Sequence, residues 1–101
     1  MRRGEVYRYA PVLQRAGQST VRLVVSADVV NENDDLAACY ALHVVDTDPG
    51  SLLAVEIAPH GWAFALLLDR SPRSLLVERL GTATTEQMEA VDTSLRAVLE
   101  L

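Results

Sequence analysis

The sequence contains no lysine and only one cysteine among its 101 residues. A single cysteine, Cys39, excludes an intrachain disulfide bond and a zinc site built from several cysteines. Cys39 stands beside Tyr40 in an apolar stretch. Free cysteines in such surroundings are usually buried, so we expect an unreactive thiol inside the protein.

Long apolar runs are also lacking. The longest uncharged apolar run covers residues 62–68, whereas a membrane-spanning helix needs about 20 such residues. After Arg2 and Arg3, polar and apolar residues alternate, and this opening does not have the continuous apolar stretch of a signal peptide. We therefore expect a soluble, cytoplasmic protein that makes no contact with membranes.

Positive charge is scarce. The chain has nine basic and 14 acidic residues, which gives a formal net charge of −5. Proteins that bind nucleic acid usually carry a positive field, because contacts with phosphates supply much of their affinity. Any binding of RNA must therefore depend on a local patch of arginines. The length and the hydrophobic content of 50% indicate one folded domain, residues 1–101, with one core.

Short β-rich runs separated by turn residues make up most of the chain. The segment of residues 11–20 contains Pro, Gly, Gln and Ser and predicts a long loop, while residues 31–35 and 48–50 predict turns. Breaks are also expected at residues 59–61 and 71–73. This pattern is typical of a small barrel or sandwich, and a sheet of this size normally curls to hide its edges, so we predict a mainly β fold with a small barrel. The expected strands are residues 5–10, 21–26, 40–47, 52–57, 62–68 and 75–80.

The end of the chain has a helical pattern. Thr84 and Gln87 have the spacing of a capping box, in which each side chain bonds the backbone of the other residue. Apolar residues then recur at helical spacing, and we expect one amphipathic helix over residues 85–99 that packs on the barrel. Its apolar stripe consists of Met88, Val91, Leu95 and Leu99.

Several of these segments resemble the MazF/PemK toxins of bacterial toxin–antitoxin systems. The resemblance includes the opening Arg3-Gly4-Glu5-Val6-Tyr7, the second strand Leu23-Val24-Val25-Ser26 followed by Asn31, the third strand that ends at Thr47, and the turn Arg79-Leu80-Gly81 before the C-terminal helix. Residues 6–9, Arg22-Leu23, and Trp62 with Asp69 are also similar to CcdB, a gyrase poison with a related barrel. The likeness implies an SH3-like β-barrel with a C-terminal helix that forms a homodimer and is silenced by a cognate antitoxin.

For an enzyme of the MazF type, the resemblance implies cleavage of single-stranded RNA without a metal or cofactor. The ribose 2′-OH attacks the adjacent phosphate and leaves a cyclic phosphate and a 5′-OH. In the family an arginine at the start of the second strand and a threonine at the end of the third strand carry out this reaction. Thr47 matches the threonine. Aligning Ser26 and Asn31 with the family pattern puts Thr20 at the arginine position, so that Arg22 lies two residues late. We take Arg22 and Thr47 as catalytic candidates and Thr20 as an RNA contact.

Other residues near these positions have two interpretations. His43 lies on the same strand face as Thr47 and is either a catalytic acid or base or a half-buried strand histidine. Asp46 is a possible base, while Asp48 is explained by the turn that follows. Trp62 either stacks on a base or fills the mouth of the barrel.

The missing positive patch has three candidates: Arg15 in the first loop, and Arg70 and Arg73, which are expected in a second loop around Ser71-Pro72. They are either RNA contacts or solvated surface residues.

Two further functions stay open. One is a gyrase binder of the CcdB type, although residues 97–101 lack the aromatic end that this activity needs. The other is a degenerate family member that binds an antitoxin without catalysis.

Overall fold

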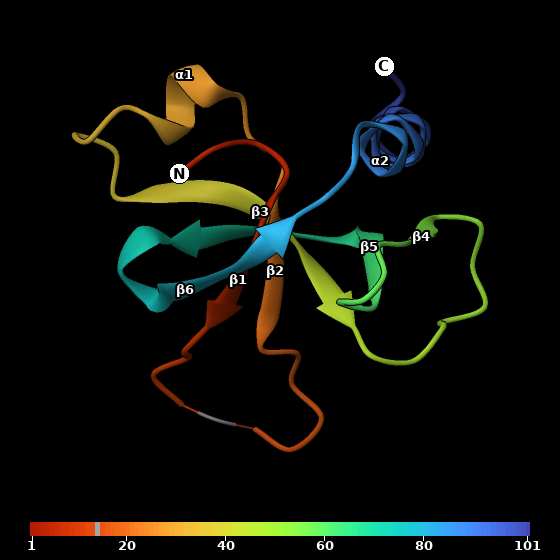
Figure 1. Ribbon diagram of the computed structural model, residues 1–101, viewed down its shortest axis with the longest axis horizontal. Helices are drawn as coiled ribbons and strands as arrows, with labels where there is room; N and C mark the ends of the chain where they lie inside the picture. Colours follow the sequence, from red (N-terminus) through yellow and green to blue (C-terminus); the bar gives the residue numbers. More distant parts are fainter. Residues whose placement is uncertain (14) are drawn as a thin grey trace.

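The computed structural model describes residues 1–13 and 15–101 and shows a bent antiparallel sheet with one long helix (Figure 1). Gln14, in the expected first loop, lies outside the described residues. The elements are β1 (Glu5–Tyr9), β2 (Val21–Val24), α1 (Asp28–Asn31), β3 (Ala38–Val45), β4 (Ala54–Glu56), β5 (Trp62–Pro72), the short 3-10 helix η1 (Arg73–Leu75), β6 (Leu76–Thr82) and α2 (Thr85–Leu99).

The six strands form one sheet in the order β4-β5-β3-β2-β1-β6. Every expected strand is present, but among the described residues no ladder joins β4 to β6, so the sheet is open and the expectation of a closed barrel is corrected. The turn between β4 and β5 nevertheless reaches the opposite edge, where His60 packs against Gly81 of β6. The sheet therefore encloses its core through side-chain packing at this point and not through strand pairing.

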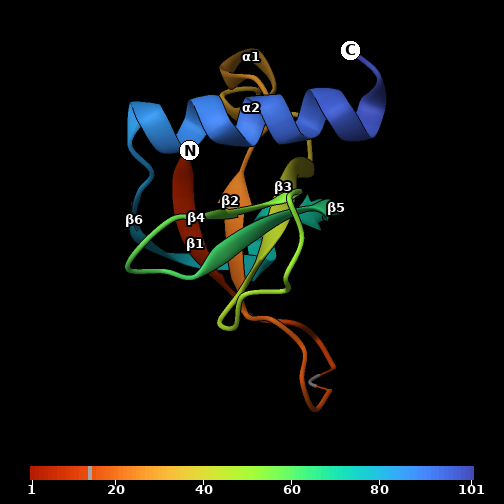
Figure 2. The ribbon, with the colours of Figure 1, turned by 90° about the vertical axis from the view of Figure 1, so that its right-hand side faces the viewer.

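The main core lies between the sheet and α2, which runs across the strands (Figure 2). Val6, Leu23 and Leu42 occupy neighbouring positions on three paired strands and contact Val91 of the helix. All four side chains are almost completely buried. Met88 and Leu95 pack against the same cluster, as expected, whereas Leu99 is 48% exposed and lies outside the core.

A second, smaller cluster lies on the other side of the sheet. It contains Val24, Cys39 and Leu76, with Tyr7 and Tyr9 packed against them. Cys39 has no exposed surface, which confirms the expected buried thiol. Burial also raises the pKa of this thiol, so the unreactive protonated form is favoured.

The helix α2 has the predicted bounds, and its first turn contains the predicted capping box. The Gln87 amide donates to Thr84 Oγ1 at 3.1 Å, and the Thr84 amide donates to Gln87 Oε1 at 2.8 Å. None of the helices in the described part of the chain combines the length and the apolar character needed to cross a membrane.

Two predicted segments differ from the structure. Residues 31–35 were expected to form only a turn, but Asn31 ends the helix α1, and its buried side chain bonds the carbonyl of Ser26 at 2.7 Å. The expected break at residues 71–73 lies slightly later, because β5 continues to Pro72 and the 3-10 helix Arg73–Leu75 separates it from β6. The side chain of Ser71 in this extension is completely buried, which ties the end of β5 to the rest of the sheet.

Candidate active site

Arg22, the first catalytic candidate, is buried with only 1% of its surface exposed. Its Nη1 donates to the carbonyl oxygens of Ser19 at 2.8 Å and Val21 at 3.1 Å. Its guanidinium lies over the ring of Tyr9, 4.3 Å from the ring centroid, in a cation–π contact. Among the described residues, the buried Nε of Arg22 has no hydrogen-bond partner. Arg22 is therefore held by the protein itself and does not project into solvent.

His43 lies directly opposite Arg22 in the β2–β3 ladder. Both residues face away from α2, because the adjacent Leu23 and Leu42 face the main core. His43 Nε2 lies 3.5 Å from Asp69 Oδ2. Burial lowers the pKa of His43 and the positive charge of Arg22 adds to this shift, while Asp69 opposes it. The net shift is downward, so His43 favours its neutral form.

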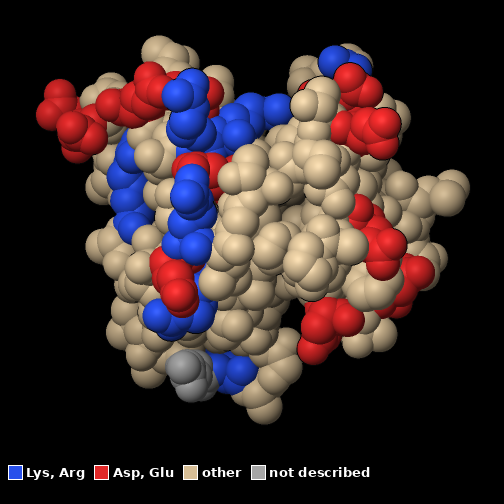
Figure 3. Space-filling view, viewed as in Figure 1, with Lys and Arg blue, Asp and Glu red and all other residues tan. Residues whose placement is uncertain are grey.

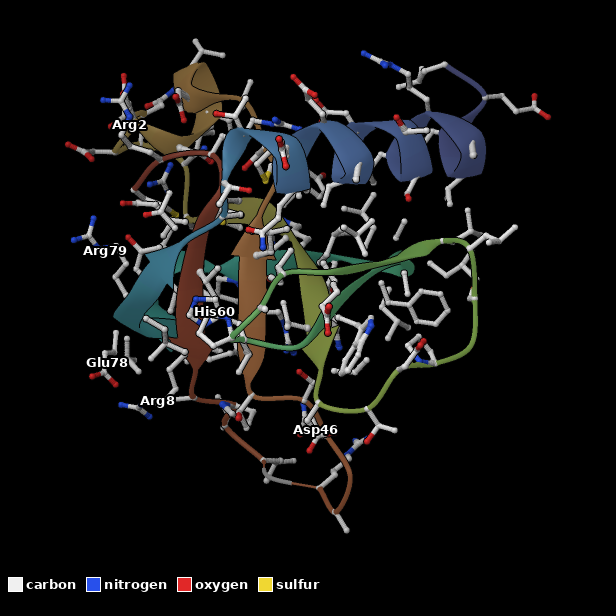
Figure 4. All side chains as sticks on the ribbon, turned by 45° about the vertical axis from the view of Figure 1, so that its right-hand side comes forward. Arg2, Arg8, Asp46, His60, Glu78 and Arg79 are labelled. Atoms are coloured by element: carbon white, nitrogen blue, oxygen red, sulfur yellow. The ribbon has the colours of Figure 1, made fainter. Side chains whose placement is uncertain are left out.

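A cavity of about 260 Å³ lies beside the β1–β2 loop. Residues 17–21 form one wall, residues 44–46 form the second, and His60 closes it from the β4–β5 turn. An adjoining hollow of about 270 Å³ shares Asp46 and His60 and extends to Trp62. Figure 4 shows His60 in front of β1 and β2, and Asp46 at the end of β3.

Ser19 fixes the wall formed by the loop. Its Oγ donates to the carbonyl of Val44 at 2.5 Å and accepts a bond from the amide of Val21 at 3.3 Å. The backbone carbonyl of Ser19 accepts the hydrogen bond from Arg22 Nη1. The loop is thus attached to β3 by a hydroxyl and to β2 by a guanidinium. Arg22 thus stabilises the loop that forms this wall. None of the described residues that line the cavity is an arginine.

The position of His60 depends on two glycines. The His60 amide donates to the Ile57 carbonyl at 3.0 Å, and the Ile57 amide donates to the Gly61 carbonyl at 2.8 Å, which closes a tight turn. Gly61 has a φ of +127°, and a Cβ there would overlap the carbonyl oxygen of Val45. A Cβ on Gly81 would lie 2.8 Å from His60 Nε2. Both positions require glycine for the imidazole to sit where it does.

The structure brings two of the other predicted residues to this cavity. Thr20 lines it directly. Thr47 lies beyond the end of β3 and is exposed, and its hydroxyl donates to Asp46 Oδ1 at 3.4 Å. Thr47 is therefore at the rim, in contact with a residue of the wall.

The predicted arginine patch is not assembled. Arg15 is exposed in the β1–β2 loop, at the opposite end of the molecule from α1 (Figures 1 and 2). Arg70 lies in β5 and lines a separate hollow with Val30. Arg73 lies in η1 and donates to carbonyls of α1 and the residues that follow it. The expectation that Arg70 and Arg73 share a loop is wrong, because a strand and a 3-10 helix occupy that segment.

Sequence reasoning missed His60. The pattern Pro59-His60-Gly61 was interpreted only as a break between strands, and the sequence does not show that this turn folds back toward Gly81. Among the described residues, no group of three His, Cys, Asp or Glu side chains is arranged to hold a metal ion.

Solved structures of similar shape cover the whole chain. An endoribonuclease from a mycobacterial species is 24% identical with a TM-score of 0.83, and the match covers 100% of this chain and 92% of that one. An endoribonuclease in complex with its cognate antitoxin, also mycobacterial, has the same identity and TM-score and is covered over 96% of its length. The MazF of a MazE–MazF complex from Deinococcus radiodurans is 19% identical with a TM-score of 0.81, over 100% and 96% of the two chains.

The chain has the MazF fold. No protein-family model and no curated protein sequence matches it, so the similarity is one of shape. In this version of the MazF fold, the cavity joins the β1–β2 loop, the end of β3 and the β4–β5 turn.

Proposed function

We propose that this protein is the toxin of a bacterial toxin–antitoxin pair and an endoribonuclease that cleaves single-stranded RNA without a metal ion. The observation that carries the proposal is the match over the full chain to endoribonuclease structures, both alone and in complex with an antitoxin. The cavity beside the β1–β2 loop supports it, because Thr20 and Thr47, at the positions matched to the family's catalytic residues, lie in its wall and at its rim.

The reaction requires a group that accepts the 2′-OH proton and donors that stabilise charge on the phosphoryl oxygens. The hydroxyls of Thr20 and Thr47 are suited to the second task, since each is exposed beside the cavity. Arg22 contributes by holding the carbonyl of Ser19. Its direct contact with RNA, and that of Arg15, Arg70 and Arg73, stay predictions, as does catalysis by His43.

The test is incubation of the purified protein with a long single-stranded RNA in the presence of EDTA. We expect cuts that leave 5′-OH ends and cyclic phosphates. Thr47→Ala should slow cleavage by about 100-fold, the usual cost of one donor at the reacting phosphate. Thr93→Ala is the matched control, because Thr93 is exposed on α2 and bonds only the carbonyl of Glu89.

A non-catalytic family member that acts by protein binding is the second candidate. The burial of Arg22 favours it, because the cavity then has no arginine to bind a phosphate. A folded protein that leaves the RNA intact in EDTA, and also with added Mg²⁺, would contradict the endoribonuclease and support this candidate. The next measurement would then be capture of DNA gyrase by the tagged protein.

A cognate antitoxin is the proposed partner, and its role is to block this activity. The homodimer that the family resemblance implies stays a prediction. Expression of the chain alone should arrest bacterial growth, and co-expression of the antitoxin should restore it.

A further inference from the structure

The cavity is lined by two ionisable side chains that the functional assignment has not used. Of the described residues that line it, Asp46 and His60 are the two with ionisable side chains, and the others are small, apolar or neutral. Both residues also line the adjoining hollow, where Glu56 is a further carboxylate, so His60 and Asp46 are shared by the two hollows. A phosphate in this space would meet one group able to carry positive charge, His60, and one able to accept a proton, Asp46.

We propose that His60 and Asp46 are the proton-transfer pair of this cavity, an inference that rests on the proposed endoribonuclease function. Asp46 accepts the proton of the ribose 2′-OH as the 2′-oxygen forms its bond to phosphorus. The bond between phosphorus and the 5′-oxygen breaks, its electron pair remains on that oxygen, and protonated His60 donates a proton to it. The products are a 2′,3′-cyclic phosphate and a 5′-OH, and exchange with water returns both side chains to their starting states.

In this proposal, His60 supplies the positive charge that Arg22 does not bring to the cavity. The Nη1 of Arg22 is bonded to two carbonyls, and its guanidinium is stacked on Tyr9. Arg22 is not among the described residues that line the cavity. Protonated His60 provides the positive charge, and it can also donate a proton, which an arginine does not do in proteins.

Each of the two side chains has a contact that orients it. His60 is fixed by its tight turn and by the close packing on Gly81. Asp46 follows the last residue of β3 and accepts a hydrogen bond from Thr47. Such positioning is what proton transfer requires, because an error of about 1 Å in placement can reduce a rate by about 100-fold.

The test compares His60→Gln, His60→Ala and Asp46→Asn with the wild-type protein. The cleavage rate is measured on a long single-stranded RNA in EDTA with enzyme in excess, and binding is measured on a 2′-O-methyl RNA, which lacks the nucleophile. Each variant should cleave about 100-fold to 10,000-fold more slowly, the range for loss of an acid or base. Affinity for the 2′-O-methyl RNA should fall much less than the cleavage rate, since the lost proton transfer belongs to the transition state.

Free imidazole supplies a further criterion. It should restore part of the activity of His60→Ala, where the side chain leaves a space, and none of the activity of His60→Gln. A residue that only supports the fold would not respond in this way. Asp34→Asn is the matched control for Asp46→Asn, because Asp34 is exposed in the loop after α1, and it should cleave at the wild-type rate.

The outcomes separate the two proposals. If the wild-type protein does not cleave RNA, the proposed function fails and this inference fails with it. If the wild-type protein cleaves and His60→Gln retains a rate within about threefold of it, His60 is not the proton donor and the endoribonuclease function stands. Restoration of His60→Gln by imidazole would also overturn the inference.

Discussion

Glu5 is 8% exposed, yet it carries a carboxylate that accepts hydrogen bonds from three residues. The Arg2 amide donates to it at 2.6 Å, the Tyr7 hydroxyl at 3.1 Å, and Arg79 Nη1 at 3.0 Å. Burial by itself raises the pKa of Glu5, but the bonds from Arg2, Arg79 and Tyr7 outweigh it and the net shift is downward. The segment that resembles the family's opening therefore has a structural role, which is to join β1 to β6.

This arrangement makes stability depend on pH. Because the pKa of Glu5 is lower in the folded state than its ordinary value of 4.5, the ionised side chain stabilises the fold above that pH. The contribution is lost as the pH falls below 4.5 and through the lowered folded pKa. We expect Glu5→Gln to reduce the free energy of unfolding by about 1–3 kcal/mol at neutral pH, with a difference from wild type that shrinks in acid. Urea titrations at several pH values measure both effects.

Glu78→Gln is the matched control. Glu78 also pairs with an arginine between β1 and β6, at 3.1 Å from Arg8, but both side chains are more than half exposed. An exposed pair of this kind contributes about 0–1 kcal/mol, so this variant should unfold nearly as the wild type does. Equal effects of the two substitutions at neutral pH would contradict the role assigned to the buried carboxylate.

At the scale of elements, the turn between β4 and β5 touches the far edge of the sheet through His60 and Gly81. We expect Gly81→Ala to push the imidazole out of position, because its Cβ would lie 2.8 Å from Nε2 and a side-chain tip yields more easily than a strand. The free energy of unfolding should change by less than about 1 kcal/mol. RNA cleavage should fall at least about tenfold, since the proton donor is displaced.

A double variant tests whether this effect acts through His60. In a His60→Ala background, Gly81→Ala should have no further effect on cleavage, because the side chain that it displaces is absent. Additive losses of rate would show that Gly81 affects the site by another route. Circular dichroism melting curves of all four proteins provide the measure of folding.

The elements that could be predicted are those whose signals are local. The helix α2 has its own cap at Thr84 and a regular apolar spacing, and its bounds were predicted correctly. The helix α1 has four residues, too few to show a period, and its Asn and Asp residues are also typical of turns. The extension of β5 to Pro72 contains Asp69 and Arg70, whose polarity resembles that of a loop, although pairing with β3 makes it a strand.

The candidate site was predicted only in part for a related reason. Thr20 and Thr47 were found because they stand at the ends of strands, and a sequence pattern can locate strand ends. Arg22 was taken as a catalytic candidate from the family resemblance, and its burial depends on Tyr9 and on the carbonyl of Ser19. His60 depends on contacts between segments that are far apart in the chain. No local pattern contains that information.

At the scale of the whole molecule, four of the nine arginines are paired with acidic neighbours. Arginine side chains gather over one half of the face shown in Figure 3, where acidic groups interrupt them. Arg2, Arg3, Arg8 and Arg79 each pair with a carboxylate. With a formal net charge of −5, the protein has no broad positive field to draw RNA to its surface.

We therefore expect affinity for RNA to depend only weakly on salt. With about two phosphate contacts, the slope of log K against log salt should be about −1.4, since each contact with a single strand contributes about −0.7. Titrations of a 2′-O-methyl RNA at several salt concentrations measure this slope, and a value steeper than about −4 would indicate a positive surface that the ion pairs do not neutralise.

The same titrations test Arg15, which is exposed in the loop that continues into the cavity wall. If it contacts a phosphate, Arg15→Gln should make the slope shallower by about 0.7. Arg96→Gln, in the last turn of α2, is the matched control and should leave the slope unchanged. An identical slope for both variants would show that Arg15 is only a surface residue.

Cys39 adds a means to observe the opening of the sheet. It is the one thiol in the chain, it has no exposed surface, and it lies in β3 opposite Ser71 of β5. An alkylating reagent therefore reaches it only when β3 separates from its neighbours, and the rate of modification measures how often that occurs. Each variant described above retains Cys39, so its alkylation rate distinguishes a protein with altered chemistry from one with a loosened sheet.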